Sequence, residues 1–288
     1  MWILYAFGSA FFAGITAVLA KIGIKNVNSH LATALRTVVV LAFAWLMVVV
    51  VGSGGQIGSL SAHTWTFLVL SGLATGASWI CYFRALQLGD VNKVAPIDKS
   101  STVLTMILAF LFLGEPFSAN MLIGMVLILS GTLLMIQKKK TEAPAAGGKS
   151  WLVWAVASAV FASLTAILGK VGIQGVESNL GTAIRTVVVL ALAWGIVFAR
   201  GLQKQISVID GKSWLFLALS GLATGLSWLC YYRALQMGSA SLVAPIDKLS
   251  ILVTVLFSYL FLKEKLSCRA AVGLALLTGG TLLLLVHF

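Results

Sequence analysis

The chain is a succession of long hydrophobic stretches separated by short polar ones. Five stretches lie in each half, and a helix of about 20 apolar residues is enough to cross the hydrocarbon core of a bilayer. We expect spans near residues 2–23, 31–51, 65–88, 94–113, 121–136, 151–173, 180–199, 214–237, 243–262 and 270–286. The pattern predicts an all-α integral membrane protein with ten transmembrane helices.

Composition narrows the class of protein further. The chain is 60% hydrophobic and 10% charged, with a mean hydropathy of +1.03, whereas a soluble domain is about 25% charged. Its three cysteines form no CxxC pair, and the chain carries no nucleotide-binding, zinc-protease or nucleophile-elbow motif. We therefore expect a protein that is not an enzyme, with no cofactor and no metal site.

The second half of the chain repeats the first at a constant offset of 149 positions, so that Lys21 aligns with Lys170 and Arg36 with Arg185. About half of the aligned residues are identical, which indicates a duplication. Because each copy has an odd number of spans, the second copy enters the membrane from the opposite face, as in many secondary transporters. We predict two inverted five-helix repeats, 1–137 and 151–288, joined by a linker at 138–150.

Charge in the loops predicts the orientation. Taking the face that holds Met1 as one side, all lysines and arginines of the loops lie on the other side, with Lys138, Lys139 and Lys140 in the linker. Cytoplasmic loops carry the excess of such residues. We expect a multi-pass protein of the inner or plasma membrane, with both termini outside and the linker in the cytoplasm. This distribution accounts for most of the net charge of +12 without a nucleic-acid partner.

A short charged motif opens the fourth span and recurs in the ninth. Val94-Ala-Pro-Ile-Asp-Lys99 is repeated letter for letter at 243–248. Charges inside an apolar span are costly, which favours a functional interpretation. Pro96 and Pro245 are predicted to mark a helix start or a hinge, since proline is tolerated in the first turn.

Further charged residues lie at similar depth. Arg84 and Asp98 are equally far from the loop between their spans, so they are predicted to pair. The first repeat thus places Lys21, Arg36, Arg84, Asp98 and Lys99 near the cytoplasmic end, and the second places Lys170, Arg185, Arg233, Asp247 and Lys248 near the outer end. Each cluster has four bases and one acid. Either the long side chains reach for the interface and the pairs are structural, or each cluster faces a cavity as a gate or as a clamp for anionic or zwitterionic ligands.

Aromatic and small residues accompany these charges. Trp79 and Tyr82 share a helix face with Thr75 and Ser78, and Trp228 and Tyr231 are their counterparts; they either line a cavity or pack in the core. The Gly72–Gly76 and Gly221–Gly225 patterns predict close helix packing. Glu115 and Glu264, which follow spans in short turns, are expected to cap the next helix.

These residues carry a family resemblance over the whole chain. The segments Cys81-Tyr-Phe-Arg-Ala-Leu86, Val94-Ala-Pro-Ile97 and Leu111-Phe-Leu-Gly-Glu115, followed by Gly124 and Gly131, together with their counterparts in the second repeat, resemble the EamA-domain family of the drug/metabolite transporter superfamily. The resemblance implies ten helices in two inverted five-helix repeats around a central substrate cavity. It also implies export or exchange of small metabolites.

Taken together, the sequence favours a secondary-active transporter, an exporter or exchanger, of a small anionic or zwitterionic metabolite that works by alternating access. The alternatives are a flippase for a phosphate-linked lipid, a multidrug or cation exporter, and a membrane assembly subunit that does not transport. The expected partners are a small-molecule substrate, with proton coupling as an open option, and membrane lipid. The chain is expected to act as a monomer or homodimer.

Overall fold

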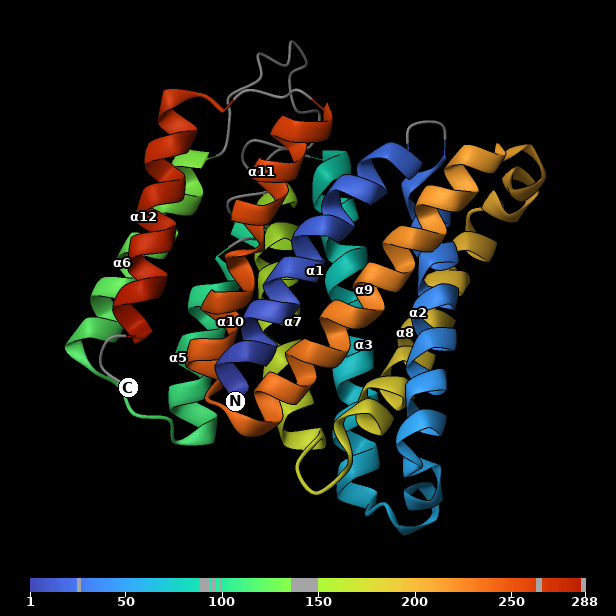
Figure 1. The fold of residues 1–288 in the computed structure, drawn as a ribbon, viewed down its shortest axis with the longest axis horizontal. Helices are drawn as coiled ribbons and strands as arrows, with labels where there is room; N and C mark the ends of the chain where they lie inside the picture. Colours follow the sequence, from blue (N-terminus) through green and yellow to red (C-terminus); the bar gives the residue numbers. More distant parts are fainter. Residues whose placement is uncertain are drawn as a thin grey trace. The chain divides into compact units, whose positions relative to one another are not determined.

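The computed structural model describes residues 1–24, 27–88, 94, 97–98, 100–135, 150–262 and 266–285, apart from the side chains of residues 83, 86, 87, 261 and 262. Its elements are helices (Figure 1). The first repeat contains α1 (Trp2–Gly23), α2 (Ser29–Val51), η1 (Ser53–Ser59), α3 (Ala62–Leu88), α5 (Ser101–Leu113) and α6 (Ala119–Met135). The second contains α7 (Ser150–Gly172), α8 (Ser178–Ala199), η2 (Leu202–Val208), α9 (Gly211–Met237), α10 (Ala240–Lys248), α11 (Ser250–Leu262) and α12 (Cys268–Leu285).

The helices confirm the predicted all-α membrane fold. Within the described residues, eight segments are long and apolar enough to cross a membrane, and α5 and α6 are shorter apolar helices. The ninth span is made of α10 and α11 in succession, which together run apolar over Ala240–Leu260. Predicted and observed helix ends differ by no more than three residues where both are described, apart from the fourth span, which was predicted from residue 94 and in which α5 begins at Ser101.

The helices are grouped in two compact units that do not follow the two repeats. One unit comprises residues 1–73, 168–238 and 250–264, and the other comprises residues 74–167, 239–249 and 265–288. Each unit therefore contains helices from both halves of the chain, and the division between the units falls inside α3 and α7. The repeats are intertwined because each supplies helices that pack against helices of the other.

In the first unit, α1 lies along α9 (Figure 1). The Ser9 and Ser227 hydroxyl oxygens are 3.2 Å apart, and the Thr224 hydroxyl lies 3.4 Å from that of Thr16. Small hydroxyl residues let two helices approach closely and exchange hydrogen bonds within lipid. This contact joins the first span of one repeat to the third span of the other.

In the second unit, α3 and α7 meet through the equivalent residues. The Ser78 and Ser158 hydroxyl oxygens are 3.3 Å apart, and the Thr75 hydroxyl donates to that of Thr165 over 3.3 Å. These four positions are those of the α1–α9 contact shifted by 149 residues. We call the two sets of residues the hydroxyl contacts; they show that the duplicated sequence builds the same helix pairing twice.

Glycines bring α6 and α12 together within the second unit, where the two helices run side by side (Figure 1). A Cβ atom at Gly131 would lie 2.5 Å from the Gly273 carbonyl oxygen, and one at Gly273 would lie 2.6 Å from the Gly131 carbonyl oxygen. Gly124 faces Gly280 in the same reciprocal way: a Cβ atom at Gly124 would lie 3.2 Å from the Gly280 carbonyl oxygen, and one at Gly280 would lie 3.1 Å from the Gly124 carbonyl oxygen. The backbones therefore touch, and larger residues cannot be accommodated without separating the helices.

Glu115 caps a helix of the other repeat, so the expectation that it caps the next helix is wrong. Its carboxylate, buried at 8% exposure, accepts hydrogen bonds from the backbone N–H groups of Ala240 (2.6 Å) and Ser241 (2.9 Å) and from the Ser241 hydroxyl (2.5 Å). These groups lie in the first turn of α10, where N–H groups lack helical partners. The next helix, α6, is capped instead by Ser118, which accepts from Met121 N–H.

Pro245 does not mark a helix start, which corrects the first of the two predicted roles. It is the sixth residue of α10 and is buried, because the helix already begins at Ala240, where Glu115 satisfies its first N–H groups. The helix is interrupted at Leu249, four residues after the proline, where Leu249 N–H bonds to Ile246 through a tighter turn. Pro96 lies outside the described residues.

We expect Gly131→Ala to destabilise the protein, because the new methyl group would meet the backbone of α12. Overpacking of this kind costs about 1–3 kcal/mol in the free energy of unfolding. Gly279→Ala on α12 is the matched control, since its Cβ has open space and alanine favours a helix. Thermal unfolding in detergent checks this, and equal melting temperatures for the two variants would contradict the packing.

We expect Glu115→Ala to lower stability by about 1–3 kcal/mol, because it leaves buried N–H groups of α10 without an acceptor. Glu115→Gln, which retains one side-chain oxygen, should fall between the alanine variant and the wild type. Thermal unfolding measures the effect. A Ser118→Ala variant separates the two caps, and a larger loss there than at Glu115 would argue against this assignment.

Candidate functional site

Arg36 projects from α2 toward α9 in the first unit. Its Nη2 donates a hydrogen bond of 2.7 Å to the Thr224 hydroxyl, while that hydroxyl donates to the Ser220 carbonyl one turn earlier. The intrahelical bond fixes the rotation of the threonine, so that its lone pairs face the guanidinium. Arg36 is partly exposed, and its Nε has no hydrogen-bond partner among the described residues.

Arg185, the counterpart of Arg36 on α8, is enclosed. It is 1% exposed, and its guanidinium carbon lies 4.3 Å from the ring centroid of Tyr232 and 5.2 Å from that of Trp228. Its Nε also donates to the Ser71 hydroxyl over 3.4 Å. Aromatic rings attract a desolvated guanidinium by about 2 kcal/mol, so these contacts hold a cation inside the helix bundle.

Lys170 and Gln236 join the ends of α7 and α9. The Lys170 ammonium donates to the Gly238 carbonyl over 2.7 Å. The Gln236 amide donates to the carbonyls of Ile173 (2.7 Å) and Val176 (2.6 Å) and accepts from Arg233 Nη1 (2.7 Å). Because carbonyls at helix C-termini lack helical donors, both side chains satisfy helix ends. Two bases of the predicted outer-end cluster, Lys170 and Arg233, are thus held at one place.

Asp98 lies next to Ser158, one of the residues of the hydroxyl contacts in the second unit. The Ser158 hydroxyl lies 2.8 Å from Asp98 Oδ1 and 3.1 Å from the Ser78 carbonyl oxygen, and its single proton can go to only one of them at a time. Tyr82 is half-buried on α3 and packs against a buried cluster of Ala85, Val94 and Ala155. The structure therefore gives Asp98 a serine partner that the sequence did not predict, while its predicted pairing with Arg84 stays a prediction.

The other predicted residues are placed as follows. Lys21 and Arg84 are exposed, whereas Trp79, Tyr231, Asp247 and Lys248 are half-buried. Trp228 and Arg185, both predicted site residues, are brought together by the ring contact described above. Lys99 lies outside the described residues.

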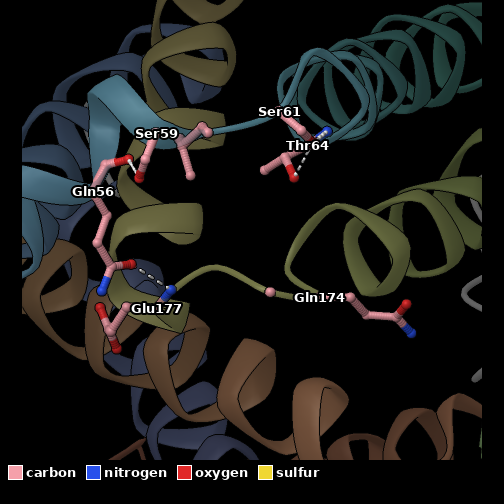
Figure 2. Close-up of a pocket in the computed structure, with 8 residues that line it drawn as sticks. Gln56, Ser59, Ser61, Thr64, Gln174 and Glu177 are labelled. Carbon is pink, nitrogen blue, oxygen red and sulfur yellow. Dashed lines mark hydrogen bonds between the residues drawn. The ribbon is translucent and has the colours of Figure 1, made fainter.

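A pocket of about 460 Å³ lies near the ends of the spans in the first unit (Figure 2). Figure 2 shows that the Gln56 side chain of η1 points to the backbone of Glu177, whose N–H donates to Gln56 Oε1 over 3.2 Å. Hydroxyl and amide groups line it together with the Glu177 carboxylate. That carboxylate accepts from the N–H groups of Asn179 and Leu180, so it serves as the cap of α8.

Sequence reasoning found the charges but missed most of their partners. Thr16, Ser71, Ser158 and Gln236 were not singled out, although each has an identical residue 149 positions away. A polar residue kept in both copies of an apolar span is the signal that could have found them. Their groups are neutral, so these hydrogen bonds do not themselves cancel the charge of the residues that they contact. Among the described residues, no three potential ligands are grouped to hold a metal.

The sequence pattern of the EamA-like transporter family matches the chain twice, over residues 1–137 and 149–286. A curated relative from Sinorhizobium sp., described as an uncharacterized transporter in the cobO 3' region, is 52% identical over 138 residues, which are 48% of this chain and 98% of the relative. The uncharacterized transporter YxxF of Bacillus subtilis is 22% identical over 86% of this chain and 77% of its own length.

One solved structure, titled only as the crystal structure of a protein, has the same fold. It aligns with a TM-score of 0.78 and 18% sequence identity, over 99% of this chain and 96% of the other. The Sinorhizobium relative has the length of one repeat, which agrees with the duplication. With both halves matched, the chain belongs to the EamA-like transporter family and is a multi-pass membrane transporter.

Proposed function

We propose that this chain is a secondary-active transporter that exports or exchanges a small anionic or zwitterionic metabolite by alternating access. The observation that carries the proposal is the environment of the bases within the spans. Arg36 binds a threonine hydroxyl, Arg185 lies against a serine and two aromatic rings, and Lys170 binds a carbonyl. The partners in these contacts are neutral, so the contacts do not themselves neutralise the charge.

Positive charge in a medium of low dielectric constant attracts an anion more strongly than the same charge in water. An arginine can also bind a carboxylate or phosphate through two parallel hydrogen bonds. A hydrophobic cation would be repelled by the same groups. Each predicted cluster has four bases and one acid, and this balance favours an anionic or zwitterionic substrate over a cationic drug.

The two clusters at opposite ends suggest how access would alternate. In this proposal, the Arg84–Asp98 pair closes the cytoplasmic end, and the charged cluster of the second repeat acts at the outer end. The termini lie outside the inner membrane and the linker lies in the cytoplasm. The contact of Asp98 with Ser158 on α7 supports part of it, because it ties this residue to a neighbouring helix whose separation would open an end. Arg233 reaches the end of α7 only through Gln236, which lies on its own helix and donates to the Ile173 carbonyl.

The substrate class is tested by thermal unfolding of the purified protein in detergent with anionic, zwitterionic and cationic metabolites. A ligand that binds the folded state raises the melting temperature, by an amount equivalent to about 2.7 kcal/mol at a hundred times its dissociation constant. We expect carboxylates, phosphates or amino acids to stabilise the protein. Stabilisation by hydrophobic cations alone would contradict the proposal and favour a multidrug exporter.

The transport step is tested by counterflow of a stabilising ligand into proteoliposomes. We expect Arg84→Ala and Asp98→Asn to slow counterflow, because each removes one partner of the proposed cytoplasmic closure. Arg200→Gln, at the exposed end of α8, controls for the loss of one positive charge. If both gate variants transport like the wild type, the gating pair is wrong; if the wild type shows no counterflow, the transport proposal fails.

A further inference from the structure

Arg36 and Arg185 occupy the same position in the two repeats but have different surroundings. Arg185 is 1% exposed and lies between Tyr232 and Trp228, whereas Arg36 is partly exposed. The described contacts of Arg36 consist of one bond to a neutral hydroxyl. Each guanidinium has one buried nitrogen without a hydrogen-bond partner among the described residues, Nε in Arg36 and Nη1 in Arg185, so the two arginines differ in exposure and in ring contacts. The repeat symmetry therefore does not extend to the roles of these two arginines.

The sequence departs from the repeat where it contacts Arg185. Tyr232 stands where the first repeat has Phe83, and Gly169 stands where it has Ala20. A Cβ at Gly169 would lie 2.7 Å from Tyr232 Cε1, so the glycine makes the room that the tyrosine ring occupies. Two neighbouring differences thus combine to enclose the arginine of the second repeat.

The polar groups around Arg36 fix the position of its guanidinium and leave some of its N–H donors able to bind a ligand. The Thr224 hydroxyl donates its proton to the Ser220 carbonyl and accepts one hydrogen bond from Arg36. The hydroxyl oxygens of Thr224 and Thr16 are 3.4 Å apart. A guanidinium has five N–H donors. An unsatisfied buried donor on a cation is costly, and an incoming carboxylate or phosphate removes that cost while neutralising the charge.

We propose that Arg36 binds the anionic group of the substrate, a carboxylate or a phosphate, and that Thr224 positions its guanidinium. Arg185 holds α8 against α9 through its aromatic contacts and does not bind the substrate. This inference rests on the proposed function, because it names the residue that recognises an anionic substrate. It separates two residues that the repeat makes equivalent.

The test measures stabilisation of the purified protein by inorganic phosphate and by succinate, each titrated during thermal unfolding. Arg36→Gln should raise the apparent dissociation constant on the order of ten- to a hundredfold, as expected for the loss of a hydrogen-bonded charge. Arg36→Lys should also weaken binding, because lysine lacks the planar fork. Arg185→Gln should lower the melting temperature without ligand and keep the ligand-dependent rise. Arg200→Gln is the charge-matched control.

Thr224→Val tests the positioning role and guards against misfolding of the Arg36 variants. It keeps the charge and the approximate volume, and it should weaken binding by about two- to tenfold, less than Arg36→Gln. If Arg36→Gln does not fold, Thr224→Val and Arg36→Lys decide the matter. Unchanged binding in both would overturn the assignment.

The outcomes distinguish this inference from the proposed function. If the wild type binds phosphate or succinate and Arg36→Gln binds them equally well, or if only Arg185→Gln loses binding, the assignment to Arg36 is wrong and the function stands. If neither anion stabilises the wild type and tetraphenylphosphonium does, both are wrong. Stabilisation by a short-chain phosphatidic acid is measured in the same way. Stabilisation by this lipid alone, lost in Arg36→Gln, would support Arg36 and place the phosphate on a lipid headgroup.

Discussion

A charge inside a membrane-spanning helix must find its polar partners within the protein, because lipid offers none. In this chain the requirement falls on bases more than on acids, and the described contacts of Arg36, Asp98 and Lys170 meet it with neutral groups. Hydroxyls hold Arg36 and Asp98, and carbonyls hold Lys170 and Gln236. Because neutral partners lower the cost of burial without cancelling the charge, the helix bundle can stay positive where its helices meet.

The same partners also explain why the two repeats are intertwined. A span that carries a serine or threonine needs a second span with a matching group, and the sequence places those groups on the first and third spans of each copy. The first span of one repeat therefore pairs with the third span of the other, through Ser9 with Ser227 and through Ser78 with Ser158. Duplication of one sequence thus produces two equivalent contacts, and each compact unit contains parts of both copies.

Much of the fold could be predicted from the sequence, since hydrophobic length sets the spans and the fixed offset reveals the repeats. The helix pairing could not, because a pattern along one helix shows which face is polar and not which helix meets it. Glu115 illustrates this limit: local sequence pointed to the next helix, whereas the N–H groups that it satisfies belong to Ala240 and Ser241. Pro245 was misplaced for the same reason, because a cap supplied from elsewhere lets α10 begin earlier.

The candidate site shows how duplicated sequence can acquire separate roles. Arg36 and Arg185 were equally strong candidates, because type, position and hydrophobic context are the same in both. Their difference comes from Gly169 and Tyr232, which contact each other and enclose one arginine. A cation enclosed by two rings is closed to a further ligand, whereas Arg36 is partly exposed and its described contacts leave donors that a ligand can reach. Identical residues in an inverted repeat therefore need not form a symmetric site, and a substrate that passes between two ends can be recognised by one copy while the other keeps the helices together.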